Sequence, residues 1–343
     1  MDKNLNRRHF VKTAAIGGMG LGLAGNFTSL YGKSTSEGKK VGIIGLDTSH
    51  SVAYTKTLNA PDAGAEYCGY KIVAAYPKGS SEIKSSYERI PGYIDEVKKF
   101  GVEIVNSIDE LISKVDVVLL ETNDGRLHRE QALPVLKAGK KMFIDKPIAA
   151  TLADAIAIFD TAKQYNVPVF SSSSLRYISG MDKIQQGVIG KVVGADAYSP
   201  AHLEKTHSDI FWYGIHGVET LFAIMGTGCK SVSRTFTEDT DFVVGVWNDN
   251  RIGTFRGIRS GKGGYGGIAF GEKDNLVLGN FEGYNPLLIK IIEFFNTGVV
   301  PVASAETLEI CAFMEAAQES KLKKGASIEI ESVMAKAKKK QKN

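Results

Sequence analysis

Cysteine is scarce in this chain, whose 343 residues include three, Cys68, Cys229 and Cys311. The three lie far apart, are odd in number and never form the Cys-x-x-Cys spacing of zinc and redox sites. This pattern argues against a disulfide framework and against a cysteine-ligated zinc site. We expect three buried free thiols instead.

A strong surplus of charge of either sign is also missing, since the formal net charge is +4. Residues 1–32 contribute +3 and the lysines at positions 336, 338, 339, 340 and 342 contribute +5, which leaves −4 for the rest. A body without a basic surplus cannot neutralise phosphates over a broad face, so we expect no nucleic-acid partner. The lysine-rich end, residues 331–343, is predicted to be a solvated, frayed tail.

The apolar stretch near the N-terminus is too short to cross a bilayer, which takes about 20 residues. Residues 6–12 read Asn-Arg-Arg-His-Phe-Val-Lys, and the Gly-rich apolar stretch Thr13–Leu23 follows. This order resembles a twin-arginine export signal. An amphipathic helix is the alternative, which four glycines disfavour. We expect residues 1–32 to be a signal peptide, the protein to be periplasmic, and no stable membrane anchor, because no cysteine follows the apolar stretch.

The length predicts two domains, and 43% hydrophobic with 23% charged residues is ordinary globular composition. Over residues 40–175, short apolar runs alternate with helical segments, which indicates βαβ units and a doubly wound, Rossmann-like parallel sheet. The predicted strands are Val41–Leu46, Lys71–Tyr76, Val115–Glu121, Lys141–Ile144 and Val167–Ser171, and the helices are Ser51–Leu58, Tyr93–Phe100, Ile108–Ser113, Arg129–Ala138 and Leu152–Tyr165.

Over residues 176–330 strands follow one another directly, so this part is predicted to be an α+β domain with an open, mostly antiparallel sheet. We expect its helices to cover one face and the sheet to mediate a homo-oligomer. The predicted strands are Val192–Tyr198, Lys230–Thr237, Phe242–Trp247, Arg251–Ile258, Gly264–Phe270 and Asn275–Leu278, and the helices are Met181–Val188, Gly214–Ile224, Pro286–Phe295 and Ala305–Lys323.

Four segments occur in the order of a known family. They are Val-Gly-Ile-Ile-Gly-Leu over 41–46, the strand and loop over 115–128 that end in His128, Ala-Gly-Lys-Lys-Met-Phe-Ile-Asp-Lys-Pro over 138–147, and Gly-Ile-His-Gly-Val-Glu over 214–219. Together they resemble the Gfo/Idh/MocA family of nicotinamide-dependent oxidoreductases over about residues 40–330. The third segment is the most specific, with Asp145 in place of the family's Glu.

The resemblance implies that the first domain binds the cofactor and that the second places the substrate against its sheet. It implies that Lys146 lies beside the nicotinamide and the reacting carbon, and that His216 is the acid/base. The chemistry agrees, because a histidine takes a hydroxyl proton near neutral pH and an ammonium stabilises a developing alkoxide. A surface lysine and a core histidine are the plainer alternatives.

The phosphate-binding loop departs from the family's Gly-x-Gly-x-x-Gly pattern. It reads Gly45-Leu-Asp47-Thr48-Ser49-His50, so an acid and a histidine replace two glycines. A carboxylate here repels a diphosphate unless it caps the helix and points away. Thr48 and Ser49 offer hydroxyl donors, and a simple helix cap is the alternative for this stretch.

The second predicted strand ends without the acid that accepts the ribose hydroxyls of NAD. Lys78 and Ser80 tolerate a 2′-phosphate there, which favours NADP over NAD if a dinucleotide binds. The alternative is a loop that no longer binds a dinucleotide. The remaining candidate cofactor contacts are Thr122, Asn123, His128, Asp145 and Lys146.

The substrate side of the predicted site lies around His216. Trp212 stands where the family often has an acid, and Glu219, three residues after His216, is expected to influence the imidazole. Arg176 is expected either to bind a substrate oxygen or to brace the domains. Trp212 and Tyr213 offer ring faces to a sugar, or serve as core aromatics. His202, Glu204, Lys205 and His207 lie in a loop expected to face the pocket. With His216 they offer contacts to sugar hydroxyls, His202 foremost, and a solvated loop is the alternative. Their spacing matches no metal-ligand motif, so we expect no metal site.

Three functions follow from these residues. The first is an exported oxidoreductase that moves a hydride between NAD or NADP and a hydroxyl of a sugar, cyclitol or glycoside. The second is a carbohydrate lyase or hydratase that uses Lys146 and His216 for proton abstraction without net redox change. The third is a non-catalytic sugar-binding protein on the same scaffold. In each case the partner is a small carbohydrate.

Overall fold

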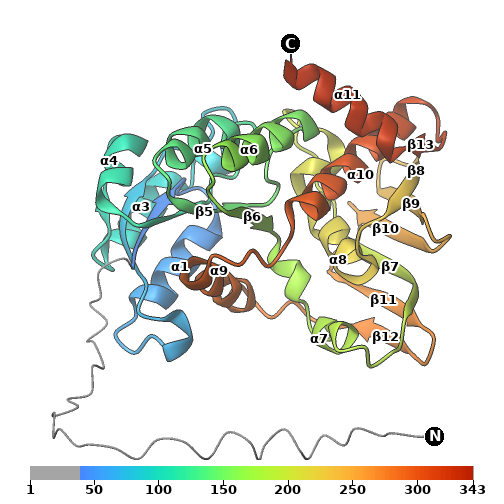
Figure 1. The fold of residues 1–343 in the computed structure, drawn as a ribbon, viewed down its shortest axis with the longest axis horizontal. Helices are drawn as coiled ribbons and strands as arrows, with labels where there is room; N and C mark the ends of the chain where they lie inside the picture. The colour runs from blue at the N-terminus through green and yellow to red at the C-terminus, as the bar shows by residue number, and fades with distance from the viewer. Residues whose placement is uncertain (1–38, 343) are drawn as a thin grey trace, which may run out of the picture. The chain divides into compact units, whose positions relative to one another are not determined.

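The N-terminal half forms a six-stranded parallel sheet in the computed structural model, which describes residues 39–342 (Figure 1). The strand order β3-β2-β1-β4-β5-β6 is that of a doubly wound dinucleotide-binding sheet, as the sequence predicted. The signal peptide predicted over residues 1–32 lies outside the described residues. The strands are β1 (Lys40–Ile44), β2 (Lys71–Tyr76), β3 (Glu103–Ile104), β4 (Val117–Leu120), β5 (Lys141–Asp145) and β6 (Val169–Ser172).

Helices cover both faces of this sheet, with α5 and α6 on one side and α1 on the other (Figure 1). All four residues of β4 are buried because both faces are covered, which explains its unbroken apolar sequence. Ser107 and Thr151 cap α4 and α6 by accepting hydrogen bonds from backbone N–H groups. The helices are α1 (Ser49–Asn59), α2 (Lys84–Tyr87), α3 (Ile90–Lys98), α4 (Ile108–Lys114), α5 (His128–Lys137) and α6 (Leu152–Gln164).

The second half forms a seven-stranded sheet in the order β12-β11-β7-β10-β9-β8-β13. Among the described strands of this second sheet, β7 and β10 are the one parallel pair. The sheet is therefore mixed but mostly antiparallel, as expected. Helices α7 (Met181–Gln185), α8 (Ile215–Met225) and α10 (Ser304–Leu322) accompany it. The strands are β7 (Val192–Pro200), β8 (Cys229–Phe236), β9 (Thr240–Trp247), β10 (Ile252–Ile258), β11 (Gly266–Gly271), β12 (Asn275–Leu278) and β13 (Ile328–Glu329).

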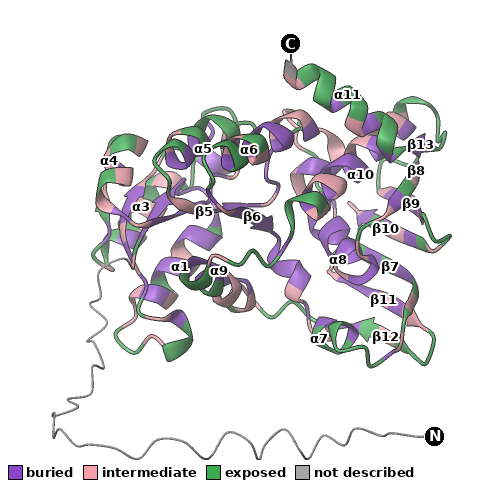
Figure 2. Ribbon diagram, in the orientation of Figure 1, coloured by how far each residue is buried: buried purple, intermediate pink, exposed green. Residues whose placement is uncertain are grey.

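One face of the second sheet is covered and the other is open (Figure 2). Burial alternates along β9, where Val243 and Trp247 are buried while Phe242 and Val244 are only partly covered. Helices α8 and α10 pack on the covered face, where Phe222 contacts the rings of Trp247 and Phe313. The open face therefore keeps a row of apolar side chains within reach of solvent.

Helix α9 (Asn285–Thr297) does not join the helices of the second domain, which corrects the prediction that it covers that sheet. It returns to the first domain and lies beside α1 on the free face of the parallel sheet (Figure 1). Phe294 packs against Phe170 of β6 with ring centroids 5.0 Å apart. The apolar stripe of this helix does not by itself indicate which of the two sheets it covers.

The lysine-rich end is helical, which corrects the prediction of a frayed tail for residues 331–342. Helix α11 (Ile330–Lys342) packs against α6 and buries Val333 and Ala337, while the lysines over 336–340 are exposed. Helix α10 in turn contacts α6, so the two domains share one hydrophobic core and form one compact unit. No helix within residues 39–342 is long and apolar enough to cross a membrane.

The three cysteines are free thiols, as predicted. Cys229 and Cys311 are buried, and burial raises the pKa of Cys229 to about 12. Cys68 is only half-buried, which corrects the expectation for that residue, because it follows a short helical turn at the surface.

Candidate functional site

A cavity of about 220 Å³ lies where the carboxyl ends of β1, β4 and β5 face the second domain. Ligands of doubly wound folds bind at this edge of the sheet. Seven of the predicted site residues line this cavity. They are Thr48, Ser49, His50, Asn123, Lys146, Tyr213 and His216.

Lys146 reaches the cavity because it directly follows β5. Its Nζ lies 3.9 Å from Oδ2 of Asp145, whose carboxylate is fully buried at the strand end. The lysine side chain is 11% exposed, so its positive charge faces the cavity rather than bulk water.

His216 enters the same cavity from the first turn of α8. Its Nδ1 lies 2.7 Å from Oγ of Ser173, in the turn that follows β6. Burial lowers the pKa of His216 well below its usual value, and the nearby charge of Lys146 lowers it further. The imidazole is therefore neutral at neutral pH.

The influence of Glu219 on His216 stays a prediction, because the Glu219 carboxylate is hydrogen-bonded to other residues. Its carboxylate accepts hydrogen bonds from Ser172 Oγ at 3.1 Å and from Arg176 Nε at 2.7 Å. Arg176 also pairs with Glu306 of α10 and does not line the cavity. Arg176 was predicted either to bind substrate or to brace the domains. Its contacts fit the brace, because Glu219 and Glu306 both lie on helices of the second domain. The neighbour of His216 is Ser173.

The phosphate-binding loop keeps its first glycine and turns its acid inward. Gly45 has a φ of +89°, and a Cβ on it would come within 2.5 Å of the Thr122 backbone nitrogen, so a side chain is excluded. The Asp47 carboxylate is fully buried and accepts hydrogen bonds from Ser86 Oγ at 2.5 Å and from the Asn123 N–H at 3.0 Å. Asp47 therefore ties three loops together and points away from the cavity.

His50 replaces the third glycine of the pattern and contacts two buried carboxylates. Its Nδ1 lies 3.2 Å from Asp145 Oδ2 and 3.5 Å from Glu121 Oε2. Burial lowers the pKa of His50, but the charges of Asp145 and Glu121 outweigh burial and raise it to about 9. Burial and the charge of Asp145 raise the pKa of Glu121 to about 7.

Thr122 and His128 do not face the cavity, which corrects their prediction as cofactor contacts. Both side chains are fully buried. The His128 ring nitrogens lie 2.6 Å from the Thr122 carbonyl and 3.2 Å from the Ile148 carbonyl, so the ring joins the loops after β4 and β5.

Lys78 and Tyr76 line a separate cavity of about 410 Å³ beyond the end of β2. It lies between the loop after β2 and the start of α5. This is the end of the parallel sheet at which the ribose of a dinucleotide lies in doubly wound folds.

The segment before His216 is a π-helical turn over Ile210–Gly214, preceded by a loop that packs onto the first domain. His207 lies 3.3 Å from Asp124 and stacks on Trp212, which does not line the cavity. His202 contacts the ring of Tyr213, and Tyr213 is hydrogen-bonded to Tyr265 at 3.0 Å. Tyr213 is thus the aromatic residue of the predicted pair that faces the cavity.

Several lining or supporting residues escaped the sequence analysis. Ser173 belongs to a run of four serines at the end of β6, and Glu121 is an acid directly after an apolar strand, so the sequence held a signal for both. Tyr265 and Tyr284 lie far along the chain in loops, and nothing in the local sequence marks them.

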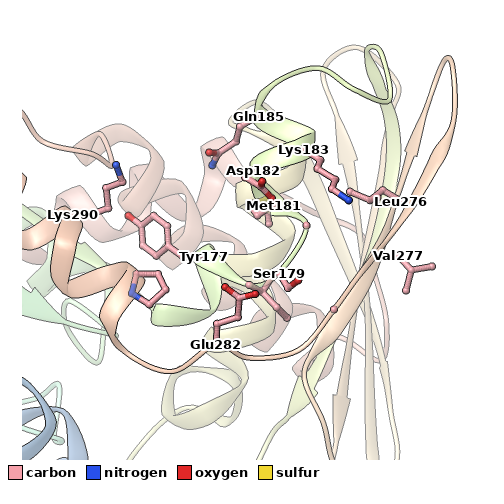
Figure 3. A pocket seen from close by; sticks show the side chains of 14 residues that line it. Tyr177, Ser179, Met181, Asp182, Lys183, Gln185, Leu276, Val277, Glu282 and Lys290 are labelled. Carbon is pink, nitrogen blue, oxygen red and sulfur yellow. The ribbon is translucent and has the colours of Figure 1, made fainter. Parts of the chain in front are cut away.

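A larger cavity of about 630 Å³ lies away from these residues, between α7, β12 and α9 (Figure 3). Its lining includes Tyr177, Glu282 and Lys290. It contains none of the predicted site residues.

Residues 39–173 match the family of oxidoreductases with an NAD-binding Rossmann fold, Gfo/Idh/MocA. The match agrees with the resemblance drawn from the sequence motifs and with the strand order. It includes the phosphate-binding loop and Lys146 but ends before His216.

Relatives and solved structures extend the likeness. The chain is 34% identical over 134 residues to a 1,5-anhydro-D-fructose reductase of Ensifer adhaerens, covering 36% of this chain and 39% of that protein. A probable dehydrogenase from Thermotoga maritima superposes with a TM-score of 0.70 at 20% identity, covering 86% and 99% of the two chains. A scyllo-inositol dehydrogenase from Lactobacillus casei, solved with NAD(H) and scyllo-inositol, gives 0.67 at 18% identity, covering 85% and 98%.

The chain spans about half the length, or less, of the first curated relatives that it matches. At these identities the solved structures establish that both domains share one fold with those dehydrogenases.

Proposed function

We propose that the protein is an NAD(P)-dependent oxidoreductase that acts on a hydroxyl-bearing carbon of a sugar, cyclitol or glycoside. The observation that carries this proposal is the convergence of Lys146 and His216 on one cavity. The two residues come from different domains, and the cavity opens at the ligand-binding edge of a Gfo/Idh/MocA domain.

The loop after β1 is compatible with a diphosphate despite Asp47. The acid is buried and hydrogen-bonded away from the cavity, so it presents no charge to an anion. Thr48 is the N-cap residue of α1, but its side chain accepts no hydrogen bond from the backbone of the helix. The N–H groups of the first helical turn are therefore free of a side-chain cap and can face an anion. Thr48 and Ser49 would bind the phosphates, and Lys78 would lie beside the ribose.

The chain's own groups divide the chemistry between two side chains. A bound nicotinamide supplies or accepts the hydride. His216 takes the hydroxyl proton on Nε2 when Nδ1 donates its hydrogen to Ser173 Oγ, which has two lone pairs and also accepts from the Leu175 N–H. Lys146 stabilises the oxygen as negative charge develops. Tyr213, Tyr265 and Tyr284 enclose the site and limit access of water.

Turnover of the purified protein on a panel of sugars and cyclitols tests this role. Lys146→Ala and His216→Ala should each lower turnover by about 10²-fold or more, as expected for acid–base groups. Lys163→Ala, an exposed lysine at the end of α6, is the matched control. Retention of full turnover by both site variants would refute the assignment. Product formation without reduction of the cofactor would favour the lyase or hydratase.

The cofactor is tested by calorimetry with NAD, NADP and their reduced forms, together with the mass of any ligand released from the protein. We expect Lys78→Ala to weaken NADP more than NAD, because the ammonium lies where a 2′-phosphate would be bound. If no dinucleotide binds and none copurifies with the protein, the result favours the non-catalytic sugar-binding protein.

We also propose export to the periplasm, supported by Arg7 and Arg8 before the Gly-rich apolar stretch. Replacing both arginines by lysine should trap the protein in the cytoplasm. Unchanged export would rule out the twin-arginine route.

A further inference from the structure

We infer that His50, Glu121 and Asp145 form a binding site for a divalent transition-metal cation such as Zn²⁺ or Mn²⁺. The ligand atoms are His50 Nδ1 and one carboxylate oxygen from each acid, and they all lie within 4.8 Å of one another. The inference goes beyond the proposed function and does not depend on it.

The spacing of the donors matches a coordination shell. His50 Nδ1 lies 3.2 Å from Asp145 Oδ2 and 3.5 Å from Glu121 Oε2. Nitrogen and oxygen ligands at about 2.0–2.2 Å from one metal stand about 2.8–3.6 Å apart in octahedral or tetrahedral geometry. Both separations from His50 Nδ1 fall within that interval, and the three ligand atoms all lie within 4.8 Å of one another.

The donors are also left without hydrogen bonds to the described residues. His50 is 6% exposed, while Glu121 and Asp145 are fully buried. His50 Nδ1 and all four carboxylate oxygens of the two acids lack a hydrogen-bond partner. Buried polar atoms are almost always satisfied, so these atoms, one from each residue lying within 4.8 Å of the others, indicate a missing partner.

A fourth side chain supports the same point. The Tyr54 hydroxyl is buried and unpartnered. The ring of His50 packs against Tyr54 and Tyr284, which hold its orientation.

Charge and ligand type select the cation. One imidazole and two carboxylates suit zinc, manganese or iron better than Ca²⁺ or Mg²⁺, which prefer oxygen ligands alone. His50 must release its proton to bind a metal, so the cation would replace that proton as the positive charge between the two carboxylates. Because His50 also lines the cavity, the metal would lie beside the site at which substrate is proposed to bind.

The three donors come from the ends of separate segments, after β1, β4 and β5, so no local spacing could reveal them. The test is metal binding by the purified protein after treatment with a chelator. Titration with Zn²⁺ and with Mn²⁺ should show one equivalent bound for at least one ion, with a higher melting temperature. Elemental analysis should show the same stoichiometry after gel filtration.

His50→Gln and Glu121→Gln preserve side-chain size and should weaken binding by about 100-fold or more, above the loss caused by removing an outer-shell partner. His207→Gln is the matched control, since His207 contacts a single carboxylate. Circular dichroism verifies folding. If a variant does not fold, the melting temperature of the parent with and without metal still decides. No bound metal in the parent, or equal affinity in folded variants, would overturn the inference and leave a proton or a water molecule between the three side chains.

Discussion

The charge states of Lys146 and His216 follow from their surroundings in the cavity. His216 is surrounded by protein and lies near the ammonium of Lys146, so both burial and charge keep it neutral. A neutral imidazole is the form that accepts a proton. The residue therefore remains a competent base in mildly acidic solution.

This state predicts the pH dependence of activity and stability. The acidic limb of kcat/KM should lie well below pH 6.5, because that limb reports the free enzyme's base. As the pH falls through 6.5 the unfolded chain takes up a proton at His216 and the folded chain does not, so stability falls. Activity profiles and urea unfolding between pH 5 and 8, compared with His216→Gln, would show both effects. An acidic limb above 6.5 contradicts the assignment.

Ser173 is expected to position His216 rather than to touch substrate. Ser173→Ala should lower kcat by about two- to tenfold with little change in KM, the equivalent of one hydrogen bond of about 0.5–1.5 kcal/mol. Ser173→Thr, which keeps the hydroxyl, should restore most of the loss. A change in KM alone would assign Ser173 to substrate binding instead.

Asp47 is predicted to stabilise the fold without acting on the cofactor. Asp47→Gly restores the family pattern but leaves Ser86 and the Asn123 N–H without their buried acceptor, which should cost about 1–3 kcal/mol. Asp47→Asn keeps an acceptor and should cost less. Urea unfolding measures the loss, and calorimetry should find dinucleotide affinity nearly unchanged. A clear gain in affinity for Asp47→Gly would mean that the carboxylate does repel the diphosphate.

At the scale of elements, α9 belongs to the first domain although it follows the strands of the second. Its apolar stripe fills the face of the parallel sheet beside α1, where Phe143, Phe170 and Phe294 form a row of ring contacts. Without this helix that face would be exposed.

Phe294→Ala should therefore destabilise the protein by about 3–5 kcal/mol, the usual cost of removing a buried aromatic ring. Asn296→Ala on the exposed side of α9 is the control and should change stability by less than about 0.5 kcal/mol. Hydrogen exchange should show faster opening of β5 and β6 but not of β9. Loss of protection in β9 instead would place α9 on the second sheet.

At the scale of the whole molecule, the open face of the second sheet leaves several apolar side chains exposed or partly exposed to solvent. Val246 and Ile252 are cross-strand partners on this face, and Ile252 is 53% exposed. Phe242 and Val244 continue the row on β9. We propose that a second copy covers this face, because a paired apolar face removes itself from water.

Val244→Asp should convert the resulting oligomer to a monomer in light scattering after gel filtration. Leu322→Asp is the control, because Leu322 is 75% exposed at the end of α10 and away from this sheet. A wild-type monomer, or an oligomer that persists in Val244→Asp, contradicts the proposed interface.

The sequence by itself determined the fold class and nearly all the strands, and its motifs agree with the family model that residues 39–173 match. The unbroken apolar run Val117–Leu120 marks a strand covered on both faces, and the alternation along Thr240–Trp247 marks one covered on a single face. These patterns are local, so periodicity alone reveals them. The motif that ends in Lys146 and Pro147 likewise marked the edge of the sheet at which the cavity lies.

Only the tertiary structure decided which partners those residues have. Glu219 is one helical turn from His216, yet Arg176 from another element takes its carboxylate. His50, Glu121 and Asp145 meet because parallel strands bring their carboxyl ends to one edge. The apolar stripe of α9 does not specify which sheet it covers, and in the structure it packs against the first sheet. The burial, hydrogen-bond partners and charge states of these side chains depend on contacts between segments that are distant in the sequence. Local periodicity therefore cannot predict them.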